Sequence, residues 1–264
     1  MSYVHQSLVY KETPQGLLVI TPYLPDDWSE SDLRVGVAFF FGGGWVSGTP
    51  TQFAHHAHAL ADLGMVCFCV DYRTMSRHAV LAPTCVEDGK SAIRWLRQHC
   101  RELGLDPNRL VAAGGSAGGH VAACAGIIPG YEDPSEDLTI SSAPNALVLF
   151  NPVLDASHDQ TLAARFGDLA IAERLAPLRH IRPGLPPTWL THGTDDEVIP
   201  FRQARQFRAQ MLAAGNHVAL LEATGERHGF YNAPAWRQRT LDNLQLFFAG
   251  LGYLQRGNRG AVPG

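Results

Sequence analysis

A serine between glycines, in residues 114–118, is the first feature of the sequence that can carry chemistry. The segment matches the pattern G-x-S-x-G around Ser116. It follows the apolar run 110–113, which predicts a strand, and it leads into residues 118–125, which can start a helix. A serine at a sharp strand-to-helix turn presents its hydroxyl oxygen to solvent, and the helix N-terminus favours nearby negative charge. The alternative is a glycine-rich turn that binds phosphate, but this context predicts that Ser116 is a nucleophile.

A nucleophilic serine needs a general base, and the base needs a carboxylate to orient it. Residues 192–200 follow an apolar strand pattern and offer three acids, at positions 195, 196 and 197. His228 stands in a glycine-flanked loop after the next apolar run, residues 218–221. Loops that follow parallel strands meet at one edge of the sheet, so both segments can reach Ser116. We therefore predict His228 as the base and leave the choice among the three acids open at this point.

The other histidines fit local roles better. His192 is typical of a packed turn, and His120 of local hydrogen bonding beside the serine. Three more lie on a predicted helix without a carboxylate or cysteine at metal-ligand spacing, so a metal site there is not favoured: His55, His56 and His58.

Three consecutive glycines, residues 42–44, follow the apolar run 35–41. Glycines expose backbone N–H groups with no side chain in the way. Acyl transfer develops negative charge on a carbonyl oxygen, and such N–H groups stabilise it. The N–H of Ala117, next to the nucleophile, is a second expected donor. A flexible or phosphate-binding loop is the alternative, but the serine and histidine motifs favour an oxyanion hole.

The elements that must position these residues alternate between strand and helix patterns. Five runs are apolar on both faces, as expected for parallel strands covered on both sides: residues 35–41, 65–70, 110–113, 146–150 and 188–191. Three apolar stripes have helical spacing: residues 86–100, 204–214 and 241–251. An N-terminal hairpin is expected around residues 14–16. The alternation predicts an α/β fold with a mostly parallel sheet.

We find no break in composition, so residues 1–254 are predicted to form one catalytic domain. The stretch 153–187 has no strand pattern; it is expected to hold a short helix around residues 161–178 and to form a small cap. Residues 255–264 have little to bury and are expected to form a disordered tail.

Composition excludes several classes of protein. The 264 residues are 45% hydrophobic, which excludes intrinsic disorder for most of the chain. The net charge of −4 argues against nucleic acid as a partner. We expect no membrane span and no signal peptide, because no apolar run is long enough and no basic stretch precedes one. The five cysteines are odd in number and fit no zinc pattern, so reduced thiols and a cytoplasmic location are expected.

Together these motifs resemble a serine esterase of the α/β-hydrolase superfamily, similar to the hormone-sensitive-lipase-like and bacterial feruloyl-esterase-like (BD-FAE) groups. The resemblance implies an α/β-hydrolase fold, with helices on both faces of a mostly parallel central sheet and a short cap insertion. The segments that carry it are residues 42–48, 71–73, 106–110, 114–120, 192–200 and 228–230.

Carried over by position, the resemblance makes Ser116 the nucleophile and His228 the base. It makes Asp196 the acid, because the family pattern is H-G-x-x-D-x-x-V-P and Ile199 occupies the valine position. The oxyanion donors that it implies are the N–H groups of Gly43, Gly44 and Ala117, with Gly42 as an alternative to Gly44.

One position departs from the family, whose glycine loop usually reads H-G-G-G. Phe41 stands where that histidine is expected. The histidine anchors the loop and is not part of the triad, so its replacement affects the rigidity of the loop rather than the class of reaction. We expect packing of Phe41 and Trp45 to hold the loop instead.

The predicted function is a serine carboxylesterase that hydrolyses small or short-chain acyl esters (acetyl, aryl or sugar esters) through an acyl-enzyme, with no cofactor and no metal. Its expected partner is a small-molecule ester, and a homodimer is left open. Alternatives are an arylformamidase or a peptidase-type amide hydrolase with the same triad, and a non-catalytic receptor that keeps the pocket. Trp45 and Trp189 are candidates to line an aromatic or sugar pocket, although both are also compatible with the core.

Overall fold

The computed structural model describes residues 3–4 and 6–254, so the predicted tail, residues 255–264, lies outside the described residues. The described chain forms a nine-stranded sheet with the order β1-β3-β5-β4-β6-β7-β8-β9, and β2 pairs with β3 off this path. The strands are β1 Tyr3–Val4, β2 Leu8–Thr13, β3 Gly16–Leu24, β4 Arg34–Phe40, β5 Val66–Val70, β6 Leu105–Gly115, β7 Ala146–Phe150, β8 Thr188–Gly193 and β9 Val218–Ala223. The sheet is parallel from β5 to β9 and antiparallel at β1, β2 and β3.

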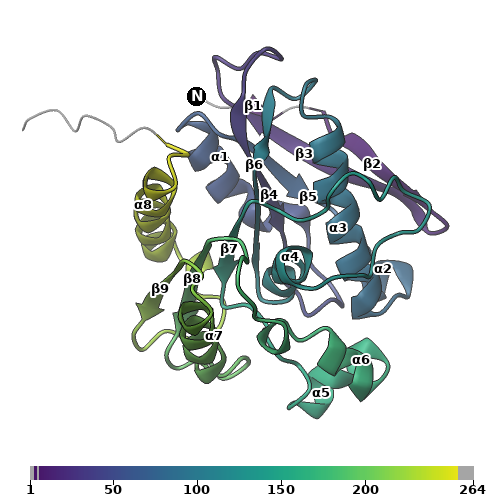
Figure 1. The fold of residues 1–264 in the computed structure, drawn as a ribbon, viewed down its shortest axis with the longest axis vertical. Helices are drawn as coiled ribbons and strands as arrows, with labels where there is room; N and C mark the ends of the chain where they lie inside the picture. Colours follow the sequence, from purple (N-terminus) through teal and green to yellow (C-terminus); the bar gives the residue numbers. More distant parts are fainter. Residues whose placement is uncertain (1–2, 5, 255–264) are drawn as a thin grey trace, which may run out of the picture.

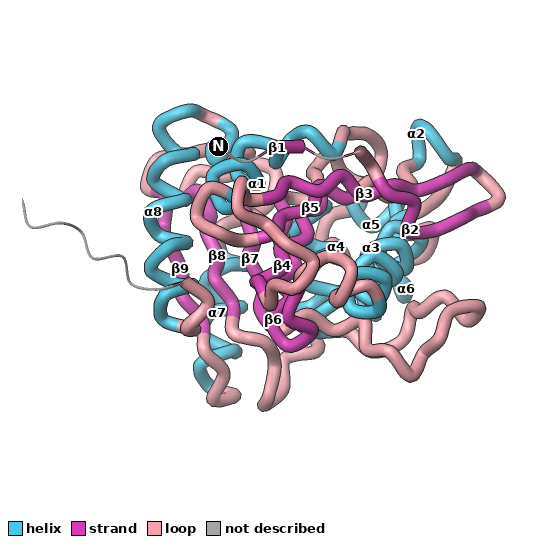
Figure 2. Tube along the Cα trace, turned by 90° about the horizontal axis from the view of Figure 1, so that it is seen from above, coloured by secondary structure: helices cyan, strands magenta, loops and turns pink. Residues whose placement is uncertain are grey.

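Helices cover both faces of this sheet. Figure 2 shows the strands running through the middle of the molecule with helices on either side. The helices are α1 Ala54–Ala61, α2 Met75–His78, α3 Ala82–Gln98, α4 Ala117–Ile127, α5 Gln160–Ala163, α6 Leu169–Arg174, α7 Arg202–Ala213 and α8 Pro234–Gly250. Short 3-10 helices are η1 Pro50–Phe53, η2 Ala164–Phe166, η3 Pro177–Arg179 and η4 Phe230–Asn232.

Two apolar cores lie on opposite faces of the sheet. One contains buried residues of α3, α4 and α7, and the other contains those of α1 and α8. The strands β5 and β7 are buried at every position, because both of their faces are covered. The predicted strands, hairpin and three helical stripes are therefore confirmed, as is the mostly parallel α/β architecture.

The register aligns the carboxyl ends of the central strands. Phe40 of β4 pairs with Gly114 of β6, and Phe150 of β7 pairs with both Gly115 and Thr191 of the neighbouring strands. The loops that follow these strands consequently open at the same edge of one sheet. This shared sheet supports the single domain over residues 1–254, which stays a prediction.

The cap differs from the single short helix predicted around residues 161–178. It consists of α5, η2, α6 and η3, and α5 and α6 lie together at the bottom of Figure 1. Gly167 ends η2 with a positive φ of 82°, a left-handed conformation that stops a helix. Asp159 caps the start of α5 and Asp168 the start of α6, because their carboxylates accept the N–H groups of Leu162 and Ala170.

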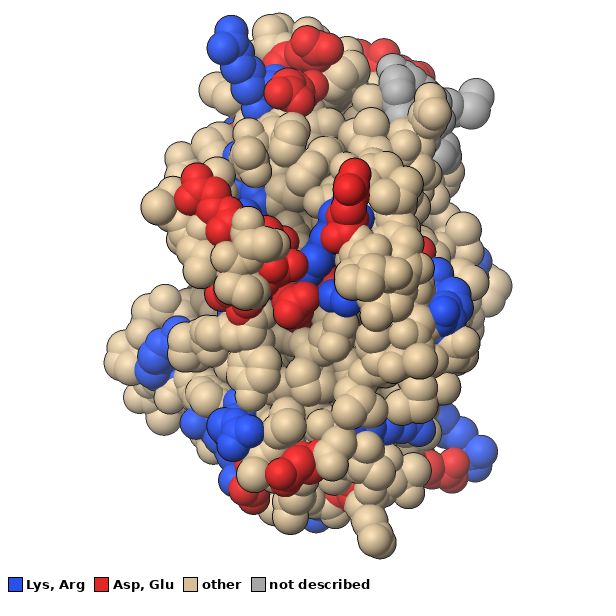
Figure 3. All heavy atoms as spheres, turned by 90° about the vertical axis from the view of Figure 1, so that its right-hand side faces the viewer, with Lys and Arg blue, Asp and Glu red and all other residues tan. Residues whose placement is uncertain are grey.

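The charged surface is mixed in sign. Figure 3 shows acidic and basic side chains lying side by side on one face. The described part of the chain contains no helix long and apolar enough to cross a membrane. All five cysteines are buried and free.

Candidate active site

Ser116 lies between the end of β6 and the start of α4, at the predicted strand-to-helix turn. Its backbone has φ 55° and ψ −120°, a conformation that is strained for a residue with a side chain. Three backbone hydrogen bonds hold it there. The Ser116 N–H donates to the Phe150 carbonyl at 2.9 Å, and the Ser116 carbonyl accepts the N–H groups of His120 at 3.0 Å and Val153 at 3.3 Å. The sheet and the helix thus fix the serine together.

The structure brings Ser116, His228 and Asp196 together. The Ser116 hydroxyl lies 2.9 Å from His228 Nε2. On the other side of the ring, His228 Nδ1 lies 2.7 Å from Asp196 Oδ2. A carboxylate only accepts hydrogen bonds, so Nδ1 carries the proton and Nε2 is left to accept from the serine. The other two candidate acids, Asp195 and Glu197, are exposed and do not join this chain of hydrogen bonds.

Asp196 is buried and heavily hydrogen-bonded. Its Oδ1 accepts the N–H groups of Val198 at 2.9 Å and Ile199 at 2.8 Å. Its Oδ2 also lies 3.1 Å from Nε2 of His192, which is fully buried beneath it. Burial by itself raises the pKa of Asp196, but the hydrogen bonds from His192, His228 and Ile199 outweigh it and hold that pKa well below its ordinary value. Asp196 is therefore ionised at neutral pH.

Asn151 is a site residue that sequence reasoning missed. It directly follows β7, is fully buried and has a positive φ of 33°. Its Nδ2 lies 3.5 Å from His228 Nε2, and its Oδ1 accepts the Gly229 N–H at 3.3 Å. It thereby ties the histidine loop to the sheet. The signal that could have found it is its place after a predicted strand, at the edge that carries Ser116.

The glycine loop after β4 makes a tight turn. Gly43 has a φ of 135°, and its carbonyl accepts the N–H groups of Val46 and Ser47 at 3.1 Å each. A Cβ at Gly43 would lie 2.1 Å from the Ser47 carbonyl oxygen, so only glycine fits there. Within the described part of the chain, the N–H groups of Gly43 and Gly44 meet no hydrogen-bond acceptor. They stay available to an oxyanion.

Gln52 of η1 is a second residue that sequence reasoning missed. Its Oε1 accepts the Gly42 N–H at 2.6 Å. This bond occupies the Gly42 N–H, which argues against Gly42 as the alternative to Gly44 in the oxyanion hole. No motif pointed to Gln52, because it lies ten residues after Gly42, outside the glycine loop that it holds.

Phe41 and Trp45 pack as predicted at the two ends of the loop. Phe41 stacks on Tyr72 with ring centroids 4.1 Å apart, and the Tyr72 hydroxyl donates to the Phe41 carbonyl at 2.6 Å. Trp45 is buried against Phe166 of the cap. Packing alone does not hold the loop, however, because Gln52 and Tyr72 add two hydrogen bonds where the family's histidine is absent.

A cavity of about 270 Å³ opens at Ser116 and His228. Cap, glycine loop and histidine loop all contribute to its lining, which includes Trp45, Gln52, Leu162, Arg165, Val198 and Tyr231. Trp189 does not line it: the ring is buried and packs edge-on against Phe150 at 5.3 Å, so this tryptophan belongs to the core. Among the described residues, no group of three or more His, Cys, Asp or Glu is arranged to hold a metal.

Known proteins resemble this chain along most of its length. A family model described as BD-FAE matches residues 23–157, just over half of the chain, and the model of the prolyl oligopeptidase family matches residues 159–252. Esterase LipC of Mycobacterium tuberculosis is 30% identical over 252 residues, which cover 86% of this chain and 60% of that protein. The chain spans 48% to 60% of the lengths of the first three curated relatives that it matches.

Solved structures match this chain over a larger share of its length. The apo form of Thermogutta terrifontis esterase 2 is 44% identical and superposes with a TM-score of 0.92, covering 96% of each chain. The propionate-bound form of the same esterase is 44% identical with a TM-score of 0.91, again over 96% of each chain.

Proposed function

This chain belongs to the BD-FAE family of the α/β-hydrolase superfamily, and from that premise we propose that it is a serine carboxylesterase acting on small or short-chain acyl esters. The observation that carries the proposal is the continuous hydrogen-bonded chain from Ser116 through His228 to Asp196. The serine end of this chain of hydrogen bonds faces a cavity that the glycine loop also lines. A small-molecule ester is the partner that this cavity fits.

In the proposed mechanism Ser116 attacks the ester carbonyl carbon while His228 Nε2 takes the hydroxyl proton. Asp196 holds the imidazole in the correct tautomer and stabilises the imidazolium. In this proposal the oxyanion accepts hydrogen bonds from the backbone N–H groups of Gly43, Gly44 and Ala117. His228 then returns the proton to the leaving alcohol. Water hydrolyses the acyl-enzyme by the same steps and frees the serine.

The size of the cavity supports a short acyl group. About 270 Å³ lies just below the usual range for ligand pockets, and the cap above the cavity is built from short helical turns. Structures of Thermogutta terrifontis esterase 2 have been determined with propionate and with butyrate bound. We propose that the present chain likewise accommodates short acyl groups.

The decisive experiment is covalent labelling of the serine. Esterase 2 of Thermogutta terrifontis has been crystallised phosphorylated by paraoxon, so paraoxon is a suitable probe. We expect one phosphoryl adduct on Ser116 by mass spectrometry, together with loss of para-nitrophenyl butyrate hydrolysis. The Ser116→Ala variant is the control and should take up no label. A wild-type protein that neither reacts with paraoxon nor turns over esters would instead be a hydrolase-fold receptor.

Amide hydrolysis is the second candidate, because residues 159–252 match the prolyl oligopeptidase family model. The same triad serves both reactions, so only the substrate separates them. Para-nitrophenyl butyrate and butyryl para-nitroanilide share the acyl group and the para-nitrophenyl ring, and each releases a coloured product. We expect turnover of the ester and little of the anilide. Faster cleavage of the anilide would favour an amidase or arylformamidase.

We also propose a cytoplasmic location, supported by five buried and unpaired cysteines in the described structure. A homodimer stays a prediction that light scattering of the purified protein can test.

A further inference from the structure

Arg165 of the cap reaches across the cavity to the glycine loop. Its Nη1 donates a hydrogen bond to the Gly44 carbonyl oxygen at 2.8 Å. A Cβ built on Gly44 would lie 1.8 Å from the same nitrogen, so the guanidinium packs directly against this glycine. The positive charge therefore lies beside the N–H groups proposed to bind the oxyanion, and it lines the cavity that opens at Ser116.

This charge has no acid to balance it. Among the described residues that line the cavity, Arg165 is the only Lys or Arg, and none is Asp or Glu. No carboxylate oxygen of the described chain lies within 4.0 Å of its guanidinium. Two buried cations elsewhere in the molecule do have acid partners: Arg73 pairs with Asp88 at 2.7 Å, and Lys90 pairs with Glu132 at 2.9 Å.

The guanidinium also has unused hydrogen-bonding capacity. It carries five N–H groups in a planar fork, and the bond to Gly44 uses one of them. Arg165 is half-buried, so water hydrates the remaining groups less well than at an open surface. A planar carboxylate matches this fork in shape and charge. A single cation balances a single negative charge, which favours a carboxylate over a doubly charged phosphate.

We propose that Arg165 selects esters that carry a carboxylate group a few bonds from the scissile carbonyl. The proposal rests on the esterase function proposed above and names a substrate class for the same site. The carboxylate pairs with the free edge of the guanidinium while the ester carbonyl oxygen lies against the neighbouring glycine N–H groups. Arg165 is then a specificity-determining residue, and the bond to Gly44 keeps its charge next to the reacting atoms.

Two matched pairs of substrates test the proposal from either side of the ester bond. The monomethyl ester of glutaric acid is compared with the methyl ester of glutaramic acid, and the butyryl ester of glycolic acid with that of glycolamide. Within each pair a carboxylate is exchanged for a neutral amide of nearly the same size. The ratio of the two kcat/KM values in one enzyme preparation does not depend on the fraction of active protein.

The test variant is Arg165→Gln, which keeps an amide N–H for the Gly44 carbonyl and removes the charge. Arg174→Gln is the control, because this exposed arginine of α6 lies outside the cavity lining and gives the same change in net charge. We expect the wild type and the control to prefer the carboxylate member of at least one pair. Arg165→Gln should reduce that preference by roughly 10- to 100-fold.

Two outcomes would overturn the proposal. One is a wild type that prefers the amide member of both pairs. The other is an Arg165→Gln variant that slows both members of each pair equally, since Arg165 would then act only by holding the glycine loop. Failure of the esterase function itself looks different: the wild type would hydrolyse no ester in either pair and would not react with paraoxon.

Discussion

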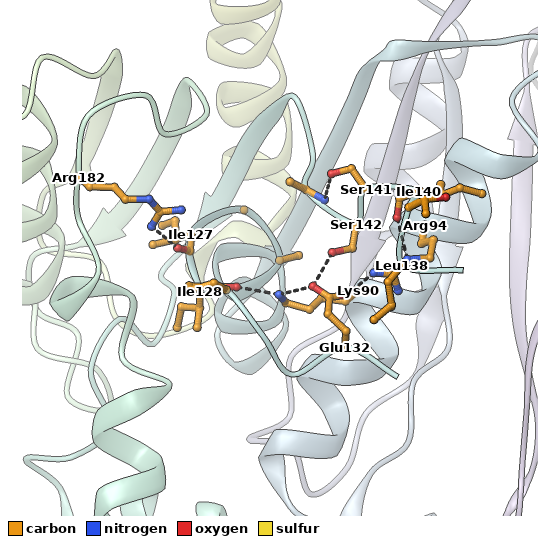
Figure 4. A pocket seen from close by; sticks show the side chains of 15 residues that line it. Lys90, Arg94, Ile127, Ile128, Glu132, Leu138, Ile140, Ser141, Ser142 and Arg182 are labelled. Atoms are coloured by element: carbon orange, nitrogen blue, oxygen red, sulfur yellow. Dashed lines mark hydrogen bonds and ion pairs between the residues drawn. The ribbon is translucent and has the colours of Figure 1, made fainter. Parts of the chain in front are cut away.

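The active-site cavity and a second, larger cavity differ in how far the polar groups of their linings are already hydrogen-bonded within the protein. The second cavity, here called the charged pocket, has a volume of about 340 Å³ and is lined by Lys90, Arg94, Glu132, Ser142, Arg182 and neighbouring residues. Figure 4 shows its side chains joined by hydrogen bonds and ion pairs. Size alone would make it the better candidate for a site, so the reason that it is not must lie in the chemistry of its lining.

Three of the four charged side chains that line the charged pocket form ion pairs within the protein, and the fourth, Arg182, donates to two backbone carbonyls. Lys90 Nζ donates to Glu132 at 2.9 Å and to the Ile128 carbonyl at 2.7 Å. Arg94 donates to both Glu132 and Glu136, and Ser142 donates to Glu132 at 3.0 Å. These bonds fasten the loop after α4 to α3. By contrast, the active-site cavity keeps a serine hydroxyl, two glycine N–H groups and most of a guanidinium available. Spare hydrogen-bonding capacity, not volume, separates a reactive cavity from a structural one.

The largest effect that this comparison predicts is at Ser116. Replacement by Ala removes the proposed nucleophile and should lower kcat for para-nitrophenyl butyrate by roughly a million-fold, as in other serine hydrolases. The midpoint of thermal unfolding should change little, because the hydroxyl faces the cavity. Residual turnover within tenfold of the wild type, about 1.4 kcal/mol in activation free energy, would mean that another group attacks the ester.

Asp196→Asn should follow with a loss of roughly ten-thousand-fold in kcat, because an amide can donate to the imidazole and favours the wrong tautomer. The variant also loses the charge that Val198, Ile199 and His192 stabilise, so the free energy of unfolding at neutral pH should fall as well. Steady-state kinetics and urea unfolding separate the two effects. Glu197→Gln, one residue away and exposed, is the matched control and should alter neither.

A substitution in the charged pocket should have the opposite effect, lowering stability while leaving activity unchanged. Lys90→Met leaves the Ile128 carbonyl and part of Glu132 without a donor in a buried setting, which should cost about 3 kcal/mol of unfolding free energy. The value of kcat/KM for para-nitrophenyl butyrate should stay at the wild-type level below the unfolding transition. A folded Lys90→Met protein with strongly reduced kcat/KM would break the comparison, because it would couple the charged pocket to the reaction.

The sequence predicted the part of the site that lies in local motifs. Ser116 and the glycine loop are recognisable from a few neighbouring residues, since the backbone turn itself requires them. The choice of Asp196 over its acidic neighbours came from the family pattern, and the structure agrees with it in geometry. The strands were predictable for a similar reason: burial on both faces leaves a continuous apolar run in the sequence.

Residues that act across the fold could not be found in this way. Gln52 and Asn151 reach the site only because η1 and β7 end beside it, and a single Gln or Asn carries no spacing signal. The cap was predicted as one helix because the breaking effect of Gly167 depends on its backbone conformation. The charged pocket was missed entirely, since its ion pairs join residues about forty positions apart.

Gln52 tests which contacts hold the backbone N–H groups of the glycine loop in position. Gln52→Ala frees the Gly42 N–H and should loosen the glycine loop, lowering kcat by about tenfold with little change in KM. Thr51→Ala, at the exposed neighbouring position of η1, is the control and should keep wild-type kinetics. An unchanged kcat in Gln52→Ala would show that Phe41 packing and the Tyr72 hydrogen bond are sufficient to hold the loop.

The smallest expected effect is the acid sensitivity of the charged pocket. Burial raises the pKa of Glu132, but hydrogen bonds from Arg94 and Lys90 outweigh it and hold the pKa below the ordinary value of 4.5. The folded state thus binds this proton more weakly than the unfolded state, so Glu132 stabilises the fold above pH 4.5 and loses that contribution as the pH falls below it. Glu132→Gln should be less stable than the wild type at neutral pH, and the difference in unfolding free energy should shrink in acid. Urea unfolding of both proteins from neutral pH down to about pH 3 measures this difference. A gap that stays constant over that range would mean that the Glu132 charge adds nothing to the stability of the charged pocket, and that the pocket is held by the shape of its side chains alone.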